Sequence, residues 1–140
     1  MSEITLGILG GGQLGSMLSV AAKKLNVKTI IYSDDQNAPA HNFCDKFINA
    51  KYNDKDKLYE FAKETDVITY EFENIPFDTL NELSKLKNVL PRPSINRLIQ
   101  HRLAEKDFIN KLNIRTTRYA HIESKKDLEP LADFLPGILK

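Results

Sequence analysis

The stretch that decides the fold is Ile4-Thr5-Leu6-Gly7-Ile8-Leu9-Gly10-Gly11-Gly12-Gln13-Leu14-Gly15. Its first half is a short apolar run with β-branched members, which predicts a buried strand from Ile4 to Leu9. The glycines that follow fit G-x-G-x-x-G, a tight turn that leads from a strand into a helix. At such a turn, backbone N–H groups and the positive helix terminus favour a phosphate or another anion.

A helix and a second strand complete the first structural unit of the chain. Apolar residues recur at helical spacing after the glycine turn, at Leu14, Met17, Leu18, Ala21, Ala22 and Leu25. Val27 to Tyr32 is then expected as the second strand. A strand, a helix and a strand in about thirty residues form a βαβ unit, whose right-handed crossover requires a parallel sheet.

The same alternation continues along the chain. We expect strands at residues 46–50, 67–72 and 89–90, and helices at 54–63, 76–86 and 95–100, the last capped by Ser94. Farther on we expect a helix at 101–112, a strand at 116–122, a helix at 124–134 and a new strand at Ile138-Leu139. The predicted class is therefore α/β, a Rossmann-like parallel sheet flanked by helices.

Composition excludes several classes of partner. The 140 residues are 41% hydrophobic and 28% charged with a net charge of +1, which is typical of a soluble globular protein without bulk attraction to nucleic acid or membrane. The start, Met1-Ser2-Glu3-Ile4, has no basic segment, and the apolar run after it is too short for a signal peptide or a membrane span. We therefore expect a cytoplasmic protein.

A second polar stretch, Tyr70-Glu71-Phe72-Glu73-Asn74, lies at the end of the strand expected at 67–72. Glu71 and Glu73 are two residues apart, so a strand places both carboxylates on one face, at the edge where open α/β sheets bind ligands. A carboxylate accepts hydrogen bonds, which suits the hydroxyls or amino group of a ligand whose phosphate is held by the glycine turn. We assign Glu71 a binding role. For Glu73 and Asn74, a solvated turn is an equal alternative.

Three segments together resemble the 5-(carboxyamino)imidazole ribonucleotide synthase family of the ATP-grasp superfamily, both in their amino-acid sequence and in their order along the chain. They are Ile8 to Gly15, Tyr70 to Asn74, and Gln100-His101-Arg102-Leu103-Ala104-Glu105-Lys106. The resemblance implies a pre-ATP-grasp domain at residues 1–93, similar to the amino-terminal domain of biotin carboxylase. It further implies a helical linker at 94–115 and the start of a truncated ATP-grasp domain at 116–140.

The resemblance implies a ligase reaction of purine biosynthesis. In this family ATP and bicarbonate form carboxyphosphate, whose carboxyl group passes to the exocyclic amine of 5-aminoimidazole ribonucleotide. The implied substrate contacts are Gly12, Gln13, Leu14 and Glu71, with Glu73 and Asn74 beside them in the site. By the same similarity, full-length members are homodimers.

The resemblance also places Arg102 and Lys140 at ATP, where a guanidinium and an ammonium neutralise phosphate oxygens. A surface cation is the alternative for Arg102, and a frayed terminus is the alternative for Lys140. Magnesium ligands are expected beyond Lys140, so no catalytic residue and no metal ligand is assigned in this chain. Phosphoryl transfer depends on positioning and metal-assisted charge neutralisation, and the chain alone is therefore expected to be inactive.

Two other functions stay open at the level of sequence. One is a Rossmann-type NAD-binding oxidoreductase domain, in which Asp34 or Asp35, about twenty residues after the glycine turn, holds the ribose. In that case a polar turn is the alternative role of the two aspartates. The other function is a non-catalytic module that dimerises through an exposed apolar surface.

Overall fold

The computed structural model describes residues 4–138, which divide into two units. Unit 1 ends at Gln100 and unit 2 begins at His101. Among the described residues, no helix is both long and apolar enough to cross a membrane. The predicted domain boundaries at 93 and 115 stay predictions.

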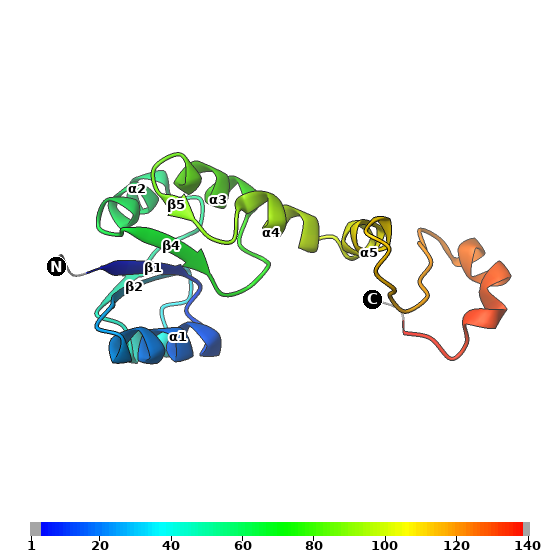
Figure 1. The fold of residues 1–140 in the computed structure, drawn as a ribbon, viewed down its shortest axis with the longest axis horizontal. Coiled ribbons are helices and arrows are strands. Elements are labelled where there is room, and N and C mark those ends of the chain that lie inside the picture. Colours follow the sequence, from blue (N-terminus) through cyan, green and yellow to red (C-terminus); the bar gives the residue numbers. More distant parts are fainter. Residues whose placement is uncertain (1–3, 139–140) are drawn as a thin grey trace. The chain divides into compact units, whose positions relative to one another are not determined.

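Unit 1 contains a five-stranded sheet in the order β3-β2-β1-β4-β5 (Figure 1), and every neighbouring pair is parallel. The strands are β1 (Thr5–Leu9), β2 (Lys28–Ser33), β3 (Lys46–Asn49), β4 (Val67–Tyr70) and β5 (Asn88–Val89). The central strand β1 pairs through Leu9 with Tyr32 of β2 on one side and with Tyr70 of β4 on the other. The predicted parallel α/β class is confirmed.

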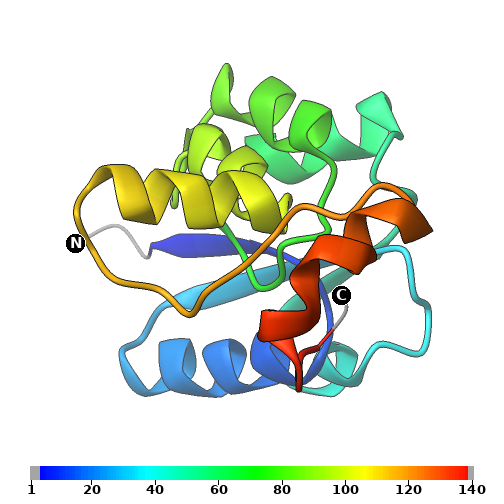
Figure 2. The same ribbon diagram turned by 90° about the vertical axis from the view of Figure 1, so that its right-hand side faces the viewer.

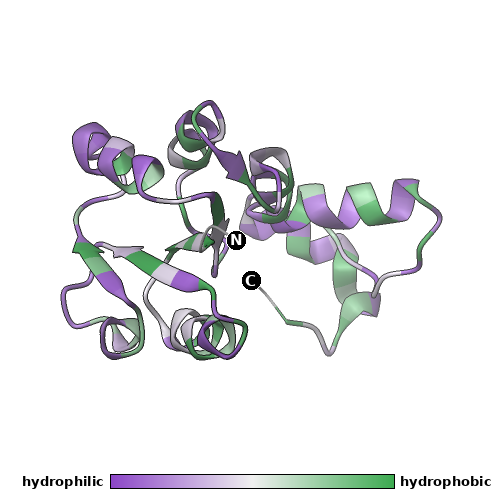
Figure 3. Cartoon of the chain, turned by 60° about the vertical axis from the view of Figure 1, so that its left-hand side comes forward, coloured by the Kyte–Doolittle hydropathy of each residue, from purple (hydrophilic) through white to green (hydrophobic). Residues whose placement is uncertain are grey.

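Helices cover both faces of this sheet, as Figures 1 and 2 show. The helix α1 (Gln13–Lys24) and the short 3-10 helix η1 (Pro39–Asn42) lie on one face, and α2 (Lys55–Lys63) and α3 (Phe77–Ser84) lie on the other. Alternate strand residues serve the two faces: Ile8 and Ile31 pack with Ala40 of η1, whereas Leu9 and Tyr32 join the larger core beneath α2 and α3. The strands accordingly carry many of the hydrophobic residues in Figure 3.

Helix starts follow local sequence signals. The side chain of Asp54 accepts a hydrogen bond from the Lys57 backbone N–H and caps α2, as predicted. The prediction that Ser94 caps the helix expected at 95–100 is wrong, because α4 (Pro93–Ile99) begins two residues earlier than expected, after Arg92. Proline suits the first helical position, since its φ is already helical and its missing N–H has no partner there.

The helix α1 packs on the sheet through small side chains. Its buried residues are Gly15, Ser19 and Ala22. The large apolar residues predicted to mark this helix point elsewhere, and Leu14, Met17, Leu18 and Leu25 are between 38% and 75% exposed. A Cβ atom on Gly15 would lie 2.9 Å from the Gly10 carbonyl oxygen, so glycine allows the helix to approach the end of β1 closely.

Unit 2 contains α5 (Arg102–Lys111) and the 3-10 helix η2 (Lys125–Phe134). The prediction of a strand at 116–122 is wrong, because these residues are not paired with any strand in the described part of the chain. They are held by side chains instead: the Tyr119 hydroxyl donates to Asp107 at 2.6 Å, and Lys106 Nζ donates to the Thr117 hydroxyl at 2.6 Å. The strand predicted at Ile138-Leu139 lies partly outside the described residues.

Candidate functional site

The candidate site lies at the carboxyl edge of the sheet, where β1 and β4 run side by side. The chain leaves β1 for α1 on one face of the sheet and leaves β4 for α3 on the opposite face (Figure 1). This divergence is the topological switch point at which open α/β sheets form a ligand-binding crevice. The glycine turn follows β1 and Glu71 follows β4, so both predicted elements meet there.

Glu71 is bonded directly to the glycine turn. Its backbone N–H donates to the Leu9 carbonyl at 3.1 Å, which continues the β4 pairing, and its side-chain Oε1 accepts from the Gly12 N–H at 3.0 Å. Gly12 is the N-cap of α1, so the carboxylate lies at the positive end of this helix. The sequence predicted a ligand phosphate at this turn, and the structure places a protein carboxylate on the Gly12 N–H instead.

The glycines make room for this carboxylate. Gly10 has a φ of +104°, and a Cβ atom there would lie 2.5 Å from Glu71 Cγ. A Cβ atom on Gly12 would lie 2.9 Å from Glu71 Oε1. Gly10 is therefore required by both its positive φ and this contact, whereas a side chain at Gly12 would force the Glu71 carboxylate to shift.

The remaining predicted substrate residues are exposed. Gln13 and Leu14 form the first turn of α1, beside Gly12, and Glu73 and Asn74 lie in the loop after β4. This loop is fixed from below by two amide side chains: Gln100 Nε2 donates to the carbonyls of Glu73 and Ile75, and Asn96 Nδ2 donates to Ile75 at 3.0 Å. The backbone of the loop is thus held while its polar side chains face solvent.

Two residues at the same edge were missed by the sequence interpretation. Ser33 ends β2, and its side chain lies 3.0 Å from the point where a Cβ atom on Gly11 would be. Tyr52 follows β3, and its ring lies between those of Tyr32 and Phe72, at 5.9 and 6.4 Å between centroids. A tyrosine three residues after the end of a parallel strand was the available signal, because every such strand ends at this edge.

The aspartates of the oxidoreductase alternative behave differently from one another. Asp35 accepts from the Asn37 backbone N–H at 2.8 Å and is therefore a turn residue. Asp34 is exposed at the end of β2. After burial, its charge is the largest cause of the raised pKa of Tyr52. A dinucleotide pyrophosphate at Gly12 would meet the carboxylate of Glu71, which disfavours that alternative.

In unit 2, the predicted ATP residue Arg102 is exposed and forms an ion pair with Glu105, one turn farther along α5. Lys140 lies outside the described residues. Residues 4–138 contain no cluster of three or more histidine, cysteine, aspartate or glutamate side chains that would hold a metal ion.

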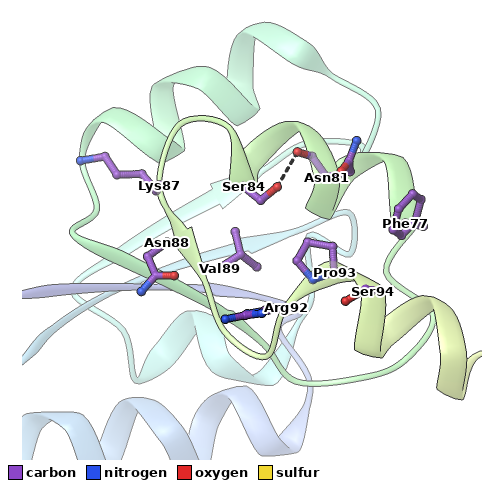
Figure 4. A pocket seen from close by; sticks show the side chains of 9 residues that line it. All are labelled: Phe77, Asn81, Ser84, Lys87, Asn88, Val89, Arg92, Pro93 and Ser94. Atoms are coloured by element: carbon purple, nitrogen blue, oxygen red, sulfur yellow. Dashed lines mark hydrogen bonds between the residues drawn. The ribbon is translucent and has the colours of Figure 1, made fainter.

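A surface pocket of about 360 Å³ lies on another part of unit 1, between α3, β5 and the start of α4 (Figure 4). Phe77 and Asn81 of α3 line one side, and Arg92 and Ser94 line the other. None of the predicted site residues takes part in it. The carboxyl edge is the better candidate site, because it has the convergent polar groups that ligand recognition needs.

The fold and this edge define the class of protein as a parallel α/β domain with a glycine turn after β1 and a carboxylate after β4. The model of the ribonucleotide synthetase preATP-grasp domain matches residues 3–100. The chain belongs to this family.

Relatives with known names agree with this assignment. An N5-carboxyaminoimidazole ribonucleotide synthase of Brucella melitensis is 40% identical over 124 residues, which are 89% of this chain and 34% of the relative. The crystal structure of the Staphylococcus aureus N5-carboxyaminoimidazole synthetase with ADP has a TM-score of 0.85 at 30% identity, covering 94% of this chain and 36% of that one.

The crystal structure of a third relative contains two ligands. The Aspergillus clavatus N5-carboxyaminoimidazole synthase, in complex with ADP and 5-aminoimidazole ribonucleotide, has a TM-score of 0.82 at 25% identity, over 96% of this chain and 36% of that one. The chain thus spans about a third of the length of these relatives. None of the three is named as an oxidoreductase, so the comparisons give the NAD-binding alternative no support.

Proposed function

We propose that this chain is the ribonucleotide-binding part of an ATP-dependent carbon–nitrogen ligase of purine biosynthesis. The reaction converts 5-aminoimidazole ribonucleotide, bicarbonate and ATP into 5-(carboxyamino)imidazole ribonucleotide, ADP and phosphate, with carboxyphosphate as the intermediate. The observation that carries the proposal is the hydrogen bond from the Gly12 N–H to Glu71 at the β1–β4 edge, inside a chain segment that matches the preATP-grasp family.

The geometry of Glu71 supports a contact with the substrate. Its Oε1 is held by the Gly12 N–H, and among residues 4–138 no donor is bonded to its Oε2. A carboxylate fixed by one oxygen is oriented in advance, so its other oxygen accepts a ligand hydroxyl or amino group at a low entropic cost. The amide of Gln13, exposed on the adjacent helix turn, both donates and accepts.

We assign Gly12, Gln13, Leu14 and Glu71 to the ribonucleotide, with Glu73 and Asn74 at the margin of the site. ATP supplies the phosphoryl group that activates bicarbonate, and the proposed contacts to it are Arg102 and Lys140. The Arg102–Glu105 ion pair is exposed and therefore weak, so the guanidinium is available to exchange Glu105 for a phosphate. Magnesium ligands would come from outside this chain, as would the residues that complete phosphoryl transfer.

Cytoplasmic location and homodimer formation belong to the same proposal. The exposed apolar side chains of α1 support self-association, because such a stripe is costly in water. The helix has no charged residue before Lys23, so two copies related by a two-fold axis would not bring like charges together along it. Analytical ultracentrifugation tests this: a monomer at all concentrations, unchanged by Met17→Glu, would contradict it.

Calorimetric titration of the chain with 5-aminoimidazole ribonucleotide tests the proposed function. We expect saturable binding that Glu71→Gln weakens by at least about tenfold, because a charge-assisted hydrogen bond contributes roughly 1.5–3 kcal/mol. Glu60→Gln, at an exposed carboxylate of α2, is the matched control and should change the affinity about twofold or less. Failure of the wild-type chain to bind, or equal effects of the two variants, would contradict the assignment.

A further inference from the structure

Tyr52 has features that core packing alone does not require. It lies between β3 and α2, and its ring contacts Tyr32 of β2 and Phe72 after β4, so it reaches across the end of the central strand β1. The ring is half-buried against the larger core. Its position brings the phenol to the carboxyl edge of three strands at once.

The backbone around Tyr52 is fixed by hydrogen bonds from neighbouring elements. The Thr79 hydroxyl of α3 donates to the Tyr52 carbonyl at 2.5 Å, and the Tyr32 hydroxyl donates to the preceding carbonyl, that of Lys51, at 2.7 Å. Thr79 and Tyr32 are themselves buried. The tyrosine is therefore held in place from the core side, which is how a group that must meet a ligand in one orientation is prepared.

The surroundings of the hydroxyl are polar and acidic. Burial, followed by the charge of Asp34 and then that of Glu71, raises the pKa of Tyr52 to about 12, against the opposing hydrogen bonding of Ser33 and the Asp34 backbone. Ser33 in turn lies against Gly11 of the glycine turn. At neutral pH the phenol therefore keeps its proton, and the charges of Asp34 and Glu71 both act on it beside the turn.

We propose that the Tyr52 hydroxyl is an additional ligand contact that selects ribose. It donates a hydrogen bond to a sugar hydroxyl, and that sugar hydroxyl in turn donates a hydrogen bond to the carboxylate of Glu71 or Asp34. This inference rests on the proposed function. A sugar hydroxyl both donates and accepts, so it satisfies a protonated phenol and a carboxylate together. A deoxy sugar leaves both protein groups without a partner, which is the strongest way to discriminate against a missing hydroxyl.

The test compares Tyr52→Phe with the wild-type chain, using 5-aminoimidazole ribonucleotide and its 2′-deoxy and 3′-deoxy analogues in calorimetry. Phenylalanine keeps the ring contacts and removes only the hydroxyl. We expect Tyr52→Phe to weaken binding of the ribonucleotide about 5- to 10-fold and to weaken one of the deoxy analogues less than about twofold, because that analogue lacks the partner hydroxyl. Tyr59→Phe, an exposed tyrosine on α2, is the matched control and should change none of the affinities.

The outcomes separate this inference from the proposed function. Wild-type binding with an unchanged affinity in Tyr52→Phe overturns the inference alone. Equal weakening of the ribonucleotide and both deoxy analogues also overturns it, because that result indicates a structural role for the hydroxyl. A wild-type chain that does not bind the ribonucleotide contradicts the proposed function, and this inference with it.

Discussion

The two units of this chain are stabilised in different ways. Unit 1 has a layered core with side chains such as Phe61 and Leu80 at 0% exposure, whereas no described residue of unit 2 is buried. The contacts of unit 2 are polar and exposed, as in the Lys106–Thr117 and Tyr119–Asp107 hydrogen bonds. The difference teaches that the proposed substrate edge is supported by a unit with its own core, while the predicted ATP residue Arg102 lies on an element without one.

Removing a core side chain should have the largest effect. We expect Phe61→Ala to lower the free energy of unfolding of unit 1 by about 3–5 kcal/mol, because it leaves a cavity beneath α2. The matched change in unit 2 is Phe108→Ala, at a ring that is 44% exposed, which should cost less than about 1 kcal/mol. Urea unfolding followed by far-ultraviolet circular dichroism measures both, and similar losses would break the contrast between the units.

Adding a side chain at the glycine turn should have the second-largest effect on stability. Gly10→Ala places a Cβ atom at positive φ and against Glu71, so we expect a loss of about 1–3 kcal/mol together with weaker ribonucleotide binding. Gly137→Ala in unit 2 is the control and should change stability by less than about 0.5 kcal/mol. A fully stable Gly10→Ala chain would show that the turn tolerates another conformation.

Helix caps offer a smaller comparison. Asp54→Ala removes the cap of α2 and should cost unit 1 about 1 kcal/mol. Ser124→Ala removes the corresponding group at the start of η2, where we expect local fraying without a shift in the unfolding midpoint of the chain. Amide hydrogen exchange distinguishes the two, and a midpoint shift in Ser124→Ala would show that unit 2 unfolds together with unit 1.

The smallest expected effect is the pH dependence that the Asp127 carboxylate gives to unit 2. Hydrogen bonds from the Ser124 backbone first, then from the Glu123 backbone and the Ser124 hydroxyl, lower the pKa of Asp127. A lowered folded-state pKa contributes stability above the unfolded-state pKa, and this contribution is lost as the pH falls through the folded-state pKa. We expect the Ser124 amide resonance to shift in that acidic range in the wild-type chain and not in Asp127→Asn, and a shift that persists in Asp127→Asn would contradict this assignment.

Much of unit 1 could be predicted because its signals are local. The apolar run before Gly10, the cap at Asp54 and the alternation of strands and helices each follow from neighbouring residues. The strand order is known only from the structure, because parallel pairing allows each crossover to place the next strand on either side. The strand predicted at 116–122 failed because a strand needs a partner, which its own residues do not supply. The glycine motif predicted an anion at the turn. The identity of that anion, the Glu71 carboxylate, could not be predicted, because it depends on the register of β1 against β4.

The most direct test of the account is a titration of the chain with 5-aminoimidazole ribonucleotide, followed by backbone amide resonances. The account predicts saturable shifts at Gly10 to Leu14 and at Glu71 to Asn74, with unit 2 unaffected. Shifts confined to the pocket between α3 and α4, or the absence of any saturable shift, would contradict the claim that the carboxyl edge of unit 1 is the ribonucleotide site.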